Sequence, residues 1–330
     1  MNILIIGAAG MIGRKLTHAL LNQGRIRGEA ITRLTLADII APEEPEFDGP
    51  IETVATDLSE PGAAARLVAS RPDVIFHLAA IVSGEAEADF EKGYRVNLDG
   101  TRALFEAIRL AGADRPYHPR VVFTSSIVVF GEPLPATIND NHCLTPLTSY
   151  GTQKAIGELL LADYSRRGFF DGIGIRLPTI SIRPGKPNKA ASGFFSSILR
   201  EPLIGEEAVL PVSETVRHWF ASPRAAVGFI LHAAELDTGA LGQLRTITMP
   251  GLSATVGEQI DALRRVAGDD AAQLIRREPN ETIATIIAGW PQGFDAARAE
   301  SLGFKGEQSF DEIIRVHIED ELGNRAPERA

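Results

Sequence analysis

The first half of the chain alternates short, almost continuously apolar runs with longer amphipathic segments. The apolar runs cover residues 2–7, 34–39, 51–56, 73–79, 120–126 and 172–178, and the amphipathic segments cover residues 11–23, 61–70, 94–111 and 150–167. Strands that are apolar on both faces are typical of a parallel sheet that helices cover on both sides. Regular alternation of such strands with helices predicts an α/β fold with a doubly wound parallel sheet.

The pattern changes after Pro178. Residues 183–193, RPGKPNKAASG, are rich in Pro, Gly and small residues, which predicts an ordered loop over a site. Residues 222–235 predict a helix, and residues 243–249 predict a strand that returns to the main sheet. Residues 251–330 contain mostly short helical segments, so we expect a smaller, mostly helical region beside the sheet.

The composition is that of an ordinary globular protein, with 44% hydrophobic and 23% charged residues. The net charge of −10 argues against nucleic acid or an anionic membrane as the main partner. A single cysteine, Cys143, excludes an intramolecular disulfide and a cysteine-based metal cluster, and no other group has metal-ligand spacing. The first strand starts at Asn2, which leaves no room for a signal peptide, and no apolar run is long enough to cross a bilayer. We therefore expect a cytoplasmic protein without a metal.

The segment NILIIGAAGMIGRKL joins the first strand to the first helix through Gly7, Gly10 and Gly13. In a dinucleotide-binding turn, the first glycine permits the tight turn and the second lets the pyrophosphate approach the backbone, while the third allows the helix to pack closely on the strand. The N–H groups at the helix start, at Met11 and Ile12, then face the phosphates. A glycine turn between a strand and a helix therefore predicts a dinucleotide site.

Asp38 closes the second strand, where a carboxylate can bind both hydroxyls of the adenosine ribose. The same carboxylate would repel the 2′-phosphate of NADP, so we predict NAD, although Arg14 and Arg33 are basic and near in sequence. The resulting domain assignment is an NAD-binding Rossmann domain, residues 1–180 and 222–250, and a substrate-binding region, residues 181–221 and 251–330.

The stretch TSYGTQKAIGELL begins a helix that places Tyr150 and Lys154 one turn apart on the same face. A phenol has a pKa of about 10, which is too high for an efficient base at neutral pH. A nearby ammonium, together with the positive nicotinamide of an oxidised cofactor, is expected to lower that pKa. The strand RVVFTSS ends at the same sheet edge, where Ser125 and Ser126 can hydrogen-bond a substrate oxygen. This combination indicates oxidation of an alcohol, in which Tyr150 accepts the hydroxyl proton as hydride leaves the same carbon for the nicotinamide.

The spacing G-x-x-G-x-x-G, the strand-end serine and the Y-x-x-x-K pair together resemble the short-chain dehydrogenase/reductase superfamily. The resemblance implies that Ser126, five residues before Gly131, is the catalytic serine rather than Ser125, and that Lys154 also binds the nicotinamide ribose. Small residues at the end of the fourth strand also leave room for a cofactor. The further residues expected to contact the cofactor or to shape its site are Asp57, Leu58, Ala79, Asn97 and Pro178.

The length and the whole chain resemble the extended branch of this superfamily, which includes nucleotide-sugar epimerases and dehydratases. Residues 176–185, RLPTISIRPG, are similar to the stretch that backs the nicotinamide, which implies that Thr179 lines the active site. Residues 216–222, VRHWFAS, resemble an Arg-Asp-Trp/Phe motif whose arginine holds the phosphate of a nucleotide-sugar. This chain keeps Arg217 but has His218 in place of the acid, which weakens the case for a nucleotide-diphosphate substrate.

In an otherwise acidic chain, the loop RPGKPNK brings Arg183 and Lys186 close together. A guanidinium or paired ammonium groups in such a loop can hold a carboxylate. The alternative for these residues, and more so for Lys189, is solvated loop charge.

A narrower resemblance runs over almost the whole chain. The segments HLAAIVSGEAEADFEKGYRVNLDGTRALFEA, FTSSIVVFGEPLP, TSYGTQKAIGELL and FDAARAESLGF are similar to the D-erythronate dehydrogenases, which oxidise the C2 hydroxyl of a four-carbon sugar acid with NAD. The resemblance implies an oxidoreductase acting on a small anionic sugar acid, with Ser83 facing the substrate and either the basic loop or Arg217 holding the carboxylate.

A nucleotide-diphosphate-sugar epimerase or dehydratase with tightly bound NAD stays open as the alternative. A non-catalytic NAD sensor is disfavoured because the serine, tyrosine and lysine are all present. The superfamily resemblance also implies a homodimer through residues 94–111 and 150–167.

Overall fold

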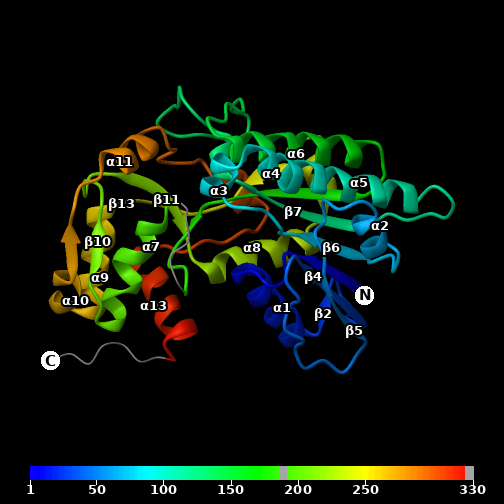
Figure 1. Cartoon of the computed structure of the whole chain (residues 1–330), viewed down its shortest axis with the longest axis horizontal. Coiled ribbons are helices and arrows are strands. Elements are labelled where there is room, and N and C mark those ends of the chain that lie inside the picture. Colours follow the sequence, from blue (N-terminus) through cyan, green and yellow to red (C-terminus); the bar gives the residue numbers. More distant parts are fainter. Residues whose placement is uncertain (186–191, 324–330) are drawn as a thin grey trace. The chain divides into compact units, whose positions relative to one another are not determined.

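The computed structural model describes residues 1–185 and 192–323, and Figure 1 labels many of its helices and strands. A seven-stranded sheet has the order β12-β8-β7-β6-β1-β4-β5. Its strands are β1 (Asn2–Ile6), β4 (Arg33–Asp38), β5 (Ile51–Ala55), β6 (Val74–His77), β7 (Arg120–Ser126), β8 (Asp171–Leu177) and β12 (Thr246–Thr248). The pairs β1–β4, β1–β6, β4–β5 and β6–β7 are parallel, which confirms the predicted Rossmann-type α/β fold. The strand order reverses at β1, between β4 and β6, which is where open α/β sheets bind ligands.

The chain divides into two compact units. The first unit contains residues Met1–Val129, Pro146–Arg176 and Val227–Ile247, and the second contains Phe130–Thr145, Leu177–Ala226 and Thr248–Ala330. Residues 130–145 belong to the second unit, whereas the sequence-based assignment places them in the NAD-binding domain. The assignment of cofactor to one unit and substrate to the other stays a prediction.

Helices of the first unit pack on the sheet or, as α3, α4 and η1 do, against α6. They are α1 (Met11–Gln23), α2 (Ala63–Val68), α3 (Ser83–Ala88), α4 (Phe90–Gly93), the π-helix η1 (Tyr94–Asp99), α5 (Gly100–Ala111), α6 (Ser149–Arg166) and most of α8 (Pro223–Glu235). Helices α5 and α6 lie side by side, and α6 contacts β7 (Figure 1). The core between them contains side chains from both layers, among them Leu4, Val121, Phe123, Phe105 and Leu161.

Two local features differ from the simplest prediction for this unit. The predicted helix over residues 94–111 is a π-helix over Tyr94–Asp99 before it becomes α5, and π-helical turns often occur at functional sites. The stretch between α1 and β4 forms a small antiparallel hairpin of β2 (Arg25–Ile26) and β3 (Glu29–Ala30). This hairpin lengthens the chain segment between the glycine turn and Asp38.

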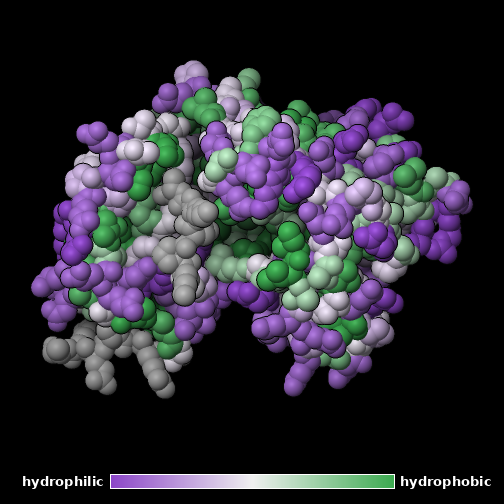
Figure 2. All heavy atoms as spheres, viewed as in Figure 1, coloured by the Kyte–Doolittle hydropathy of each residue, from purple (hydrophilic) through white to green (hydrophobic). Residues whose placement is uncertain are grey.

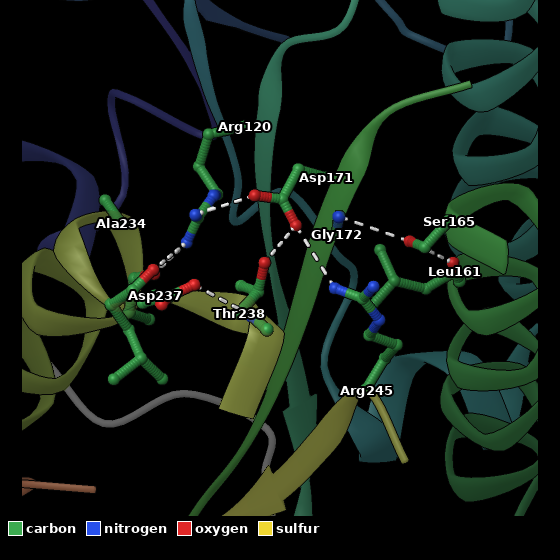
Figure 3. Close-up of polar contacts among 12 residues, drawn as sticks. Arg120, Leu161, Ser165, Asp171, Gly172, Ala234, Asp237, Thr238 and Arg245 are labelled. Atoms are coloured by element: carbon green, nitrogen blue, oxygen red, sulfur yellow. Dashed lines mark hydrogen bonds and ion pairs between the residues drawn. The ribbon is translucent and has the colours of Figure 1, made fainter. Parts of the chain in front are cut away.

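A buried ionic network ties together the starts of β7 and β8. Arg120 and Asp171 form an ion pair of 2.7 Å, and the exposed fraction of the Arg120 side chain is 3%. Arg120 also donates to two backbone carbonyls within residues 233–236, at 3.0 and 2.9 Å. Asp171 accepts a hydrogen bond from Thr238 and pairs with Arg245 at 3.1 Å. Figure 3 shows Arg120 and Arg245 on opposite sides of this carboxylate, which therefore balances two cations.

The second unit contains two small sheets and several helices. Its strands are β9 (Thr179–Ile180), β11 (Arg217–Ala221) and β13 (Leu252–Thr255) in one sheet, and β10 (Ala208–Leu210) and β14 (Ile275–Arg277) in the other. Its helices are α7 (Gly193–Arg200), α9 (Val256–Ala267), α10 (Asp269–Gln273), α11 (Glu281–Ala288), α12 (Ala297–Ser301) and α13 (Phe310–Glu321). Aromatic and aliphatic side chains from α7, α9, α13 and β11 form its core, including Phe195, Phe220, Ile260 and Ile314.

Most of the molecular face in Figure 2 is hydrophilic, and the exposed hydrophobic residues form small scattered groups. Within the described ranges, none of the helices combines the length and the apolar character that a membrane crossing requires.

Candidate active site

The glycine turn has the geometry that a dinucleotide site requires. Gly7 follows β1 with φ of +96°, and its N–H and that of Ala8 donate to Ala37 O of β4 at 2.8 and 3.1 Å. A Cβ on Gly7 would lie 2.7 Å from Ala79 N, and one on Gly13 would lie 2.1 Å from Gly7 O. Gly10 precedes α1 without a side-chain cap, so the first N–H groups of that helix, including those of Met11 and Ile12, remain available to an anion.

Asp38 lies beside this turn and at the carboxyl end of β4. Its Oδ2 accepts from Ala9 N at 2.9 Å, and its Oδ1 accepts from Ile39 N at 2.7 Å, which leaves lone pairs on both oxygens for ribose hydroxyls. Arg33 is at the opposite end of the same strand and pairs with Glu52 at 3.0 Å. Arg14 donates to Ala9 O at 2.7 Å. Asp38 therefore keeps acceptor capacity at the end of β4, where we predict the ribose to bind, while Arg33 is paired at the opposite end of the strand.

Asp57 and Leu58, which we predict to contact the cofactor, have different environments. Asp57 accepts hydrogen bonds from Ser59 N at 2.9 Å and from Ser59 Oγ at 2.6 Å, so its carboxylate caps a turn after β5. Leu58 is buried in the core of the first unit. Its side chain contributes to packing as well as to any contact with a base.

Helix α6 begins directly beside the chain that follows Ser126. Thr148 caps the helix by accepting from Gly151 N at 3.0 Å, and Glu87 of α3 accepts from Ser149 N at 2.9 Å. A Cβ on Gly151 would lie 2.4 Å from Val128 O, so only glycine allows this approach. Contacts at the helix start therefore hold Tyr150 close to the end of β7.

Lys154 lies one turn after Tyr150 and is buried, with 3% of its surface exposed. Its Nζ is 5.7 Å from the centre of the Tyr150 ring and donates to Thr124 O at 2.8 Å. Burial lowers the pKa of Lys154 to about 8, although the charge of Glu158 acts in the opposite direction. The ammonium is thus next to the phenol and partly destabilised by loss of water.

Burial raises the pKa of Tyr150 to about 12. The lowering of the phenol pKa that the sequence predicts depends on the oxidised nicotinamide as well as on Lys154, and the chain by itself does not produce it. The reason is that the half-buried phenol loses hydration, and the lysine beside it has itself lost hydration.

The two serines at the end of β7 have distinct partners. Ser125 is buried, and its Oγ donates to Glu158 Oε1 at 2.5 Å. Glu158 in turn pairs with the buried Arg176 at 2.7 Å. Ser126 is partly exposed, and its Oγ accepts from Val128 N at 3.4 Å. Of the two serines, only Ser126 is partly exposed, which fits the prediction that its hydroxyl contacts a substrate.

Asn97 lies in the π-helix and is almost fully buried. Its Oδ1 accepts from Ile81 N at 2.9 Å, and its Nδ2 donates to Gln153 Oε1 at 2.8 Å. Asn97 thus connects the segment after β6 to Gln153 of α6, the residue before Lys154. Ser83 comes two residues after Ile81 in the sequence. It is the first residue of α3 and is partly exposed.

The remaining predicted residues belong to the second unit. Pro178 is buried and Thr179 is partly exposed, directly after β8. Arg217 donates to Ser253 O at 3.0 Å and pairs with Glu258 at 3.3 Å. Lys186, like Lys189, lies outside the described residues.

Arg183 is the other arginine that we considered for binding a carboxylate. Its guanidinium donates to Ser192 Oγ at 3.0 Å. Burial, together with the neighbouring Arg200, lowers the pKa of Arg183. Arg200 pairs with Glu201 at 2.5 Å. Within residues 1–185 and 192–323, Arg183 has no carboxylate partner.

Residues 3–242 match the model of the NAD dependent epimerase/dehydratase family. The chain belongs to this family. Membership makes the protein an NAD-dependent enzyme, and the glycine turn, the available helix N–H groups and Asp38 fit that cofactor. Among the residues that the structure describes, no group of three or more His, Cys, Asp and Glu side chains is placed to hold a metal ion.

Individual members of the family give a more detailed comparison. The chain is 48% identical to D-erythronate dehydrogenase from Cupriavidus necator over 97% of this chain and 98% of that protein. It is 44% identical to D-erythronate dehydrogenase from Haemophilus influenzae over 97% of this chain and 99% of that protein. A crystal structure named as a nucleoside-diphosphate-sugar epimerase from Agrobacterium tumefaciens is 66% identical, covers 98% of this chain and 95% of its own, and has a TM-score of 0.97.

Sequence reasoning missed several residues that support the proposed site. Glu158 and Arg176 form a buried pair behind Ser125, and Gln153 holds Asn97. The spacing of Tyr150, Lys154 and Glu158 by four residues was a signal, because it places the three side chains on one face of α6. The hydrogen bond between Thr179 and His218 had no such signal, because the two residues are far apart in sequence.

Proposed function

We propose that the protein oxidises the C2 hydroxyl of D-erythronate with NAD and produces 2-dehydro-D-erythronate. Similarity to two D-erythronate dehydrogenases over almost the full length carries this proposal. The placement of Tyr150, Lys154 and Ser126 at one edge of the sheet supports the reaction type. We further propose that the enzyme acts in the cytoplasm.

Each residue in the proposed site has a defined task. Ser126 donates a hydrogen bond to the substrate oxygen, and Tyr150 accepts the hydroxyl proton. Lys154 holds a positive charge near the phenolate that forms. Bound NAD supplies the two-electron acceptor that takes the hydride from the same carbon. The alcohol thereby loses one proton and one hydride and becomes a ketone.

Arg183 is our candidate for the residue that holds the substrate carboxylate. Its side chain is partly buried and lacks a carboxylate partner among the described residues, whereas Arg217 already pairs with Glu258. A partly desolvated arginine gains more from a carboxylate than a solvated one because water competes less. Arg183 is therefore the better anchor for a small anionic acid.

The second candidate is a nucleotide-diphosphate-sugar epimerase or dehydratase with tightly bound NAD. The name of the Agrobacterium tumefaciens structure favours it. The neutral His218 in place of the acid, and the pairing of Arg217 with Glu258, weaken it. The two candidates differ in cofactor use, because epimerisation returns the cofactor to its starting state and dehydrogenation accumulates NADH.

The deciding experiment follows NADH absorbance with the purified protein, NAD and a panel of four- to six-carbon aldonates. We expect the highest kcat/KM with D-erythronate. Tyr150→Phe should lower kcat about 10²- to 10⁴-fold, because it removes the proton acceptor, and should still bind NAD. Arg183→Gln should mainly raise the KM for the acid. Conversion of a UDP-sugar without net NADH, and silence across the aldonates, would refute the proposal.

A further inference from the structure

His218 stands where the Arg-Asp-Trp/Phe motif has an acid. Its ring packs among other residues of the second unit. The side chain is completely buried in β11. It stacks on Phe195 with ring centres 5.4 Å apart and planes at 10°, and the Trp290 ring centre is 5.2 Å away. Both ring nitrogens have partners, since Nδ1 is 2.9 Å from Pro291 O and Nε2 is 2.7 Å from Thr179 Oγ1.

These two contacts determine where the protons lie. A backbone carbonyl can only accept, so Nδ1 must carry the proton that is shared with Pro291 O. Burial lowers the pKa of His218 to about 4, which keeps the ring neutral at physiological pH. In a neutral imidazole the other nitrogen has no proton, so Nε2 accepts and the Thr179 hydroxyl donates to it. The only hydroxyl proton of Thr179 is therefore committed to His218, and its oxygen can offer nothing but lone pairs.

Thr179 is well placed in the chain for contact with a substrate. It is the second residue after the carboxyl end of β8 and belongs to the stretch 176–185 that the family resemblance predicts to line the active site. The carboxyl ends of parallel strands form the edge where ligands bind in such sheets. Thr179 is also partly exposed, whereas His218 is not.

We propose that His218 is a positioning residue that holds the Thr179 hydroxyl as a hydrogen-bond acceptor and so selects a substrate that presents a hydroxyl donor there. The inference deepens the proposed function and rests on it. A carboxylate at position 218 could also accept from Thr179, but it would bring a negative charge close to the substrate. The neutral imidazole fixes the same proton without that charge, which suits an anionic sugar acid better than an acidic residue would.

A double-mutant cycle tests this coupling. Thr179→Val removes the acceptor, and His218→Asn keeps a donor for Pro291 O while it releases the Thr179 hydroxyl. We expect each single variant to raise the KM for D-erythronate by about 3- to 10-fold, with little change in the KM for NAD. The double variant should be no worse than the poorer single variant, because both changes remove one interaction. Effects that multiply in the double variant would overturn the proposal.

Two further measurements separate positioning from loss of stability. His317→Asn is the matched control, since His317 is an equally buried imidazole of the second unit in α13, and we expect it to affect unfolding without changing the KM for the acid. Nitrogen NMR of the His218 ring in the substrate-free protein should show a proton on Nδ1 and none on Nε2. A proton on Nε2 would refute the proposed hydrogen bond from Thr179 to His218. If D-erythronate proves inactive, the cycle is measured with the compound that the wild-type protein does convert. The NMR result then still tests the hydrogen bond from Thr179 to His218 separately from the proposed function.

Discussion

Ser125 and Ser126 are neighbours in sequence, but their side chains have different contacts and exposure. Ser125 donates to the buried Glu158, whereas Ser126 is partly exposed at the end of β7. We expect Ser126→Ala to lower kcat/KM by about 10²-fold, because it removes a donor to the oxygen on which charge develops. Ser125→Ala should instead cost about 1–2 kcal/mol of unfolding free energy, because it leaves Glu158 with one partner fewer. Steady-state kinetics and urea unfolding of both variants check this, and an equal loss of turnover in Ser125→Ala would contradict it.

Burial of the Lys154 ammonium in the proposed active site lowers the stability of the folded state. Its pKa in the folded protein is about 8, below the ordinary value of 10.5, so the folded protein loses this proton at lower pH than the unfolded chain. The cost of burying the ammonium is fully present below pH 8 and declines as the pH rises from 8 to 10.5.

Lys154→Met should therefore raise the free energy of unfolding at pH 7 by ~1–3 kcal/mol, and the gain should shrink towards pH 10.5. The same variant should lose NADH production, because no cation remains beside Tyr150. Chemical unfolding over a pH series measures the first effect. A destabilised variant at pH 7 would show that the hydrogen bond to Thr124 O outweighs the cost of burial.

At the scale of elements, the network around Asp171 joins the starts of β7 and β8 to the end of α8 (Figure 3). Asp171→Asn would leave the buried Arg120 without a counter-charge. We expect a loss of ~2–4 kcal/mol in unfolding free energy, because breaking a buried ion pair leaves an uncompensated charge.

Asp261→Asn provides the matched control, since the pair of Asp261 with Arg264 spans 2.7 Å but is exposed to solvent. That change should alter stability by less than ~0.5 kcal/mol, because water screens the exposed pair. Urea unfolding of both variants decides the matter, and similar losses in the two would contradict the structural role of the Asp171 network.

Elements also show where prediction from sequence succeeded. The strands and the helices α1, α5 and α6 follow from apolar periodicity, because each has a buried apolar face. The π-helical turn at residues 94–99 was not predictable in this way, since its apolar pattern resembles that of an α-helix. The hairpin at residues 25–30 is not among the elements that the apolar pattern predicted.

For the whole molecule, we propose the homodimer through α5 and α6. Large hydrophobic side chains remain exposed on this side of the first unit, at Phe90, Leu110 and Leu159, with Leu159 65% exposed. Leu159→Lys should shift the mass in light scattering from two chains to one, because a buried ammonium in the interface would be costly. Ile204→Lys, at an exposed hydrophobic residue of the second unit, should leave the mass unchanged. A wild-type mass equal to one chain would refute the dimer.

The sequence alone determined the fold class, the glycine turn and the residues proposed for chemistry. Each of these depends on local periodicity or on short spacing along one chain segment, such as the four-residue step from Tyr150 to Lys154. Tertiary structure decided which serine hydroxyl is available, how far burial shifts the pKa of Tyr150 and Lys154, and that His218 contacts Thr179. These properties depend on dehydration and on contacts between segments distant in sequence, neither of which leaves a pattern along the chain.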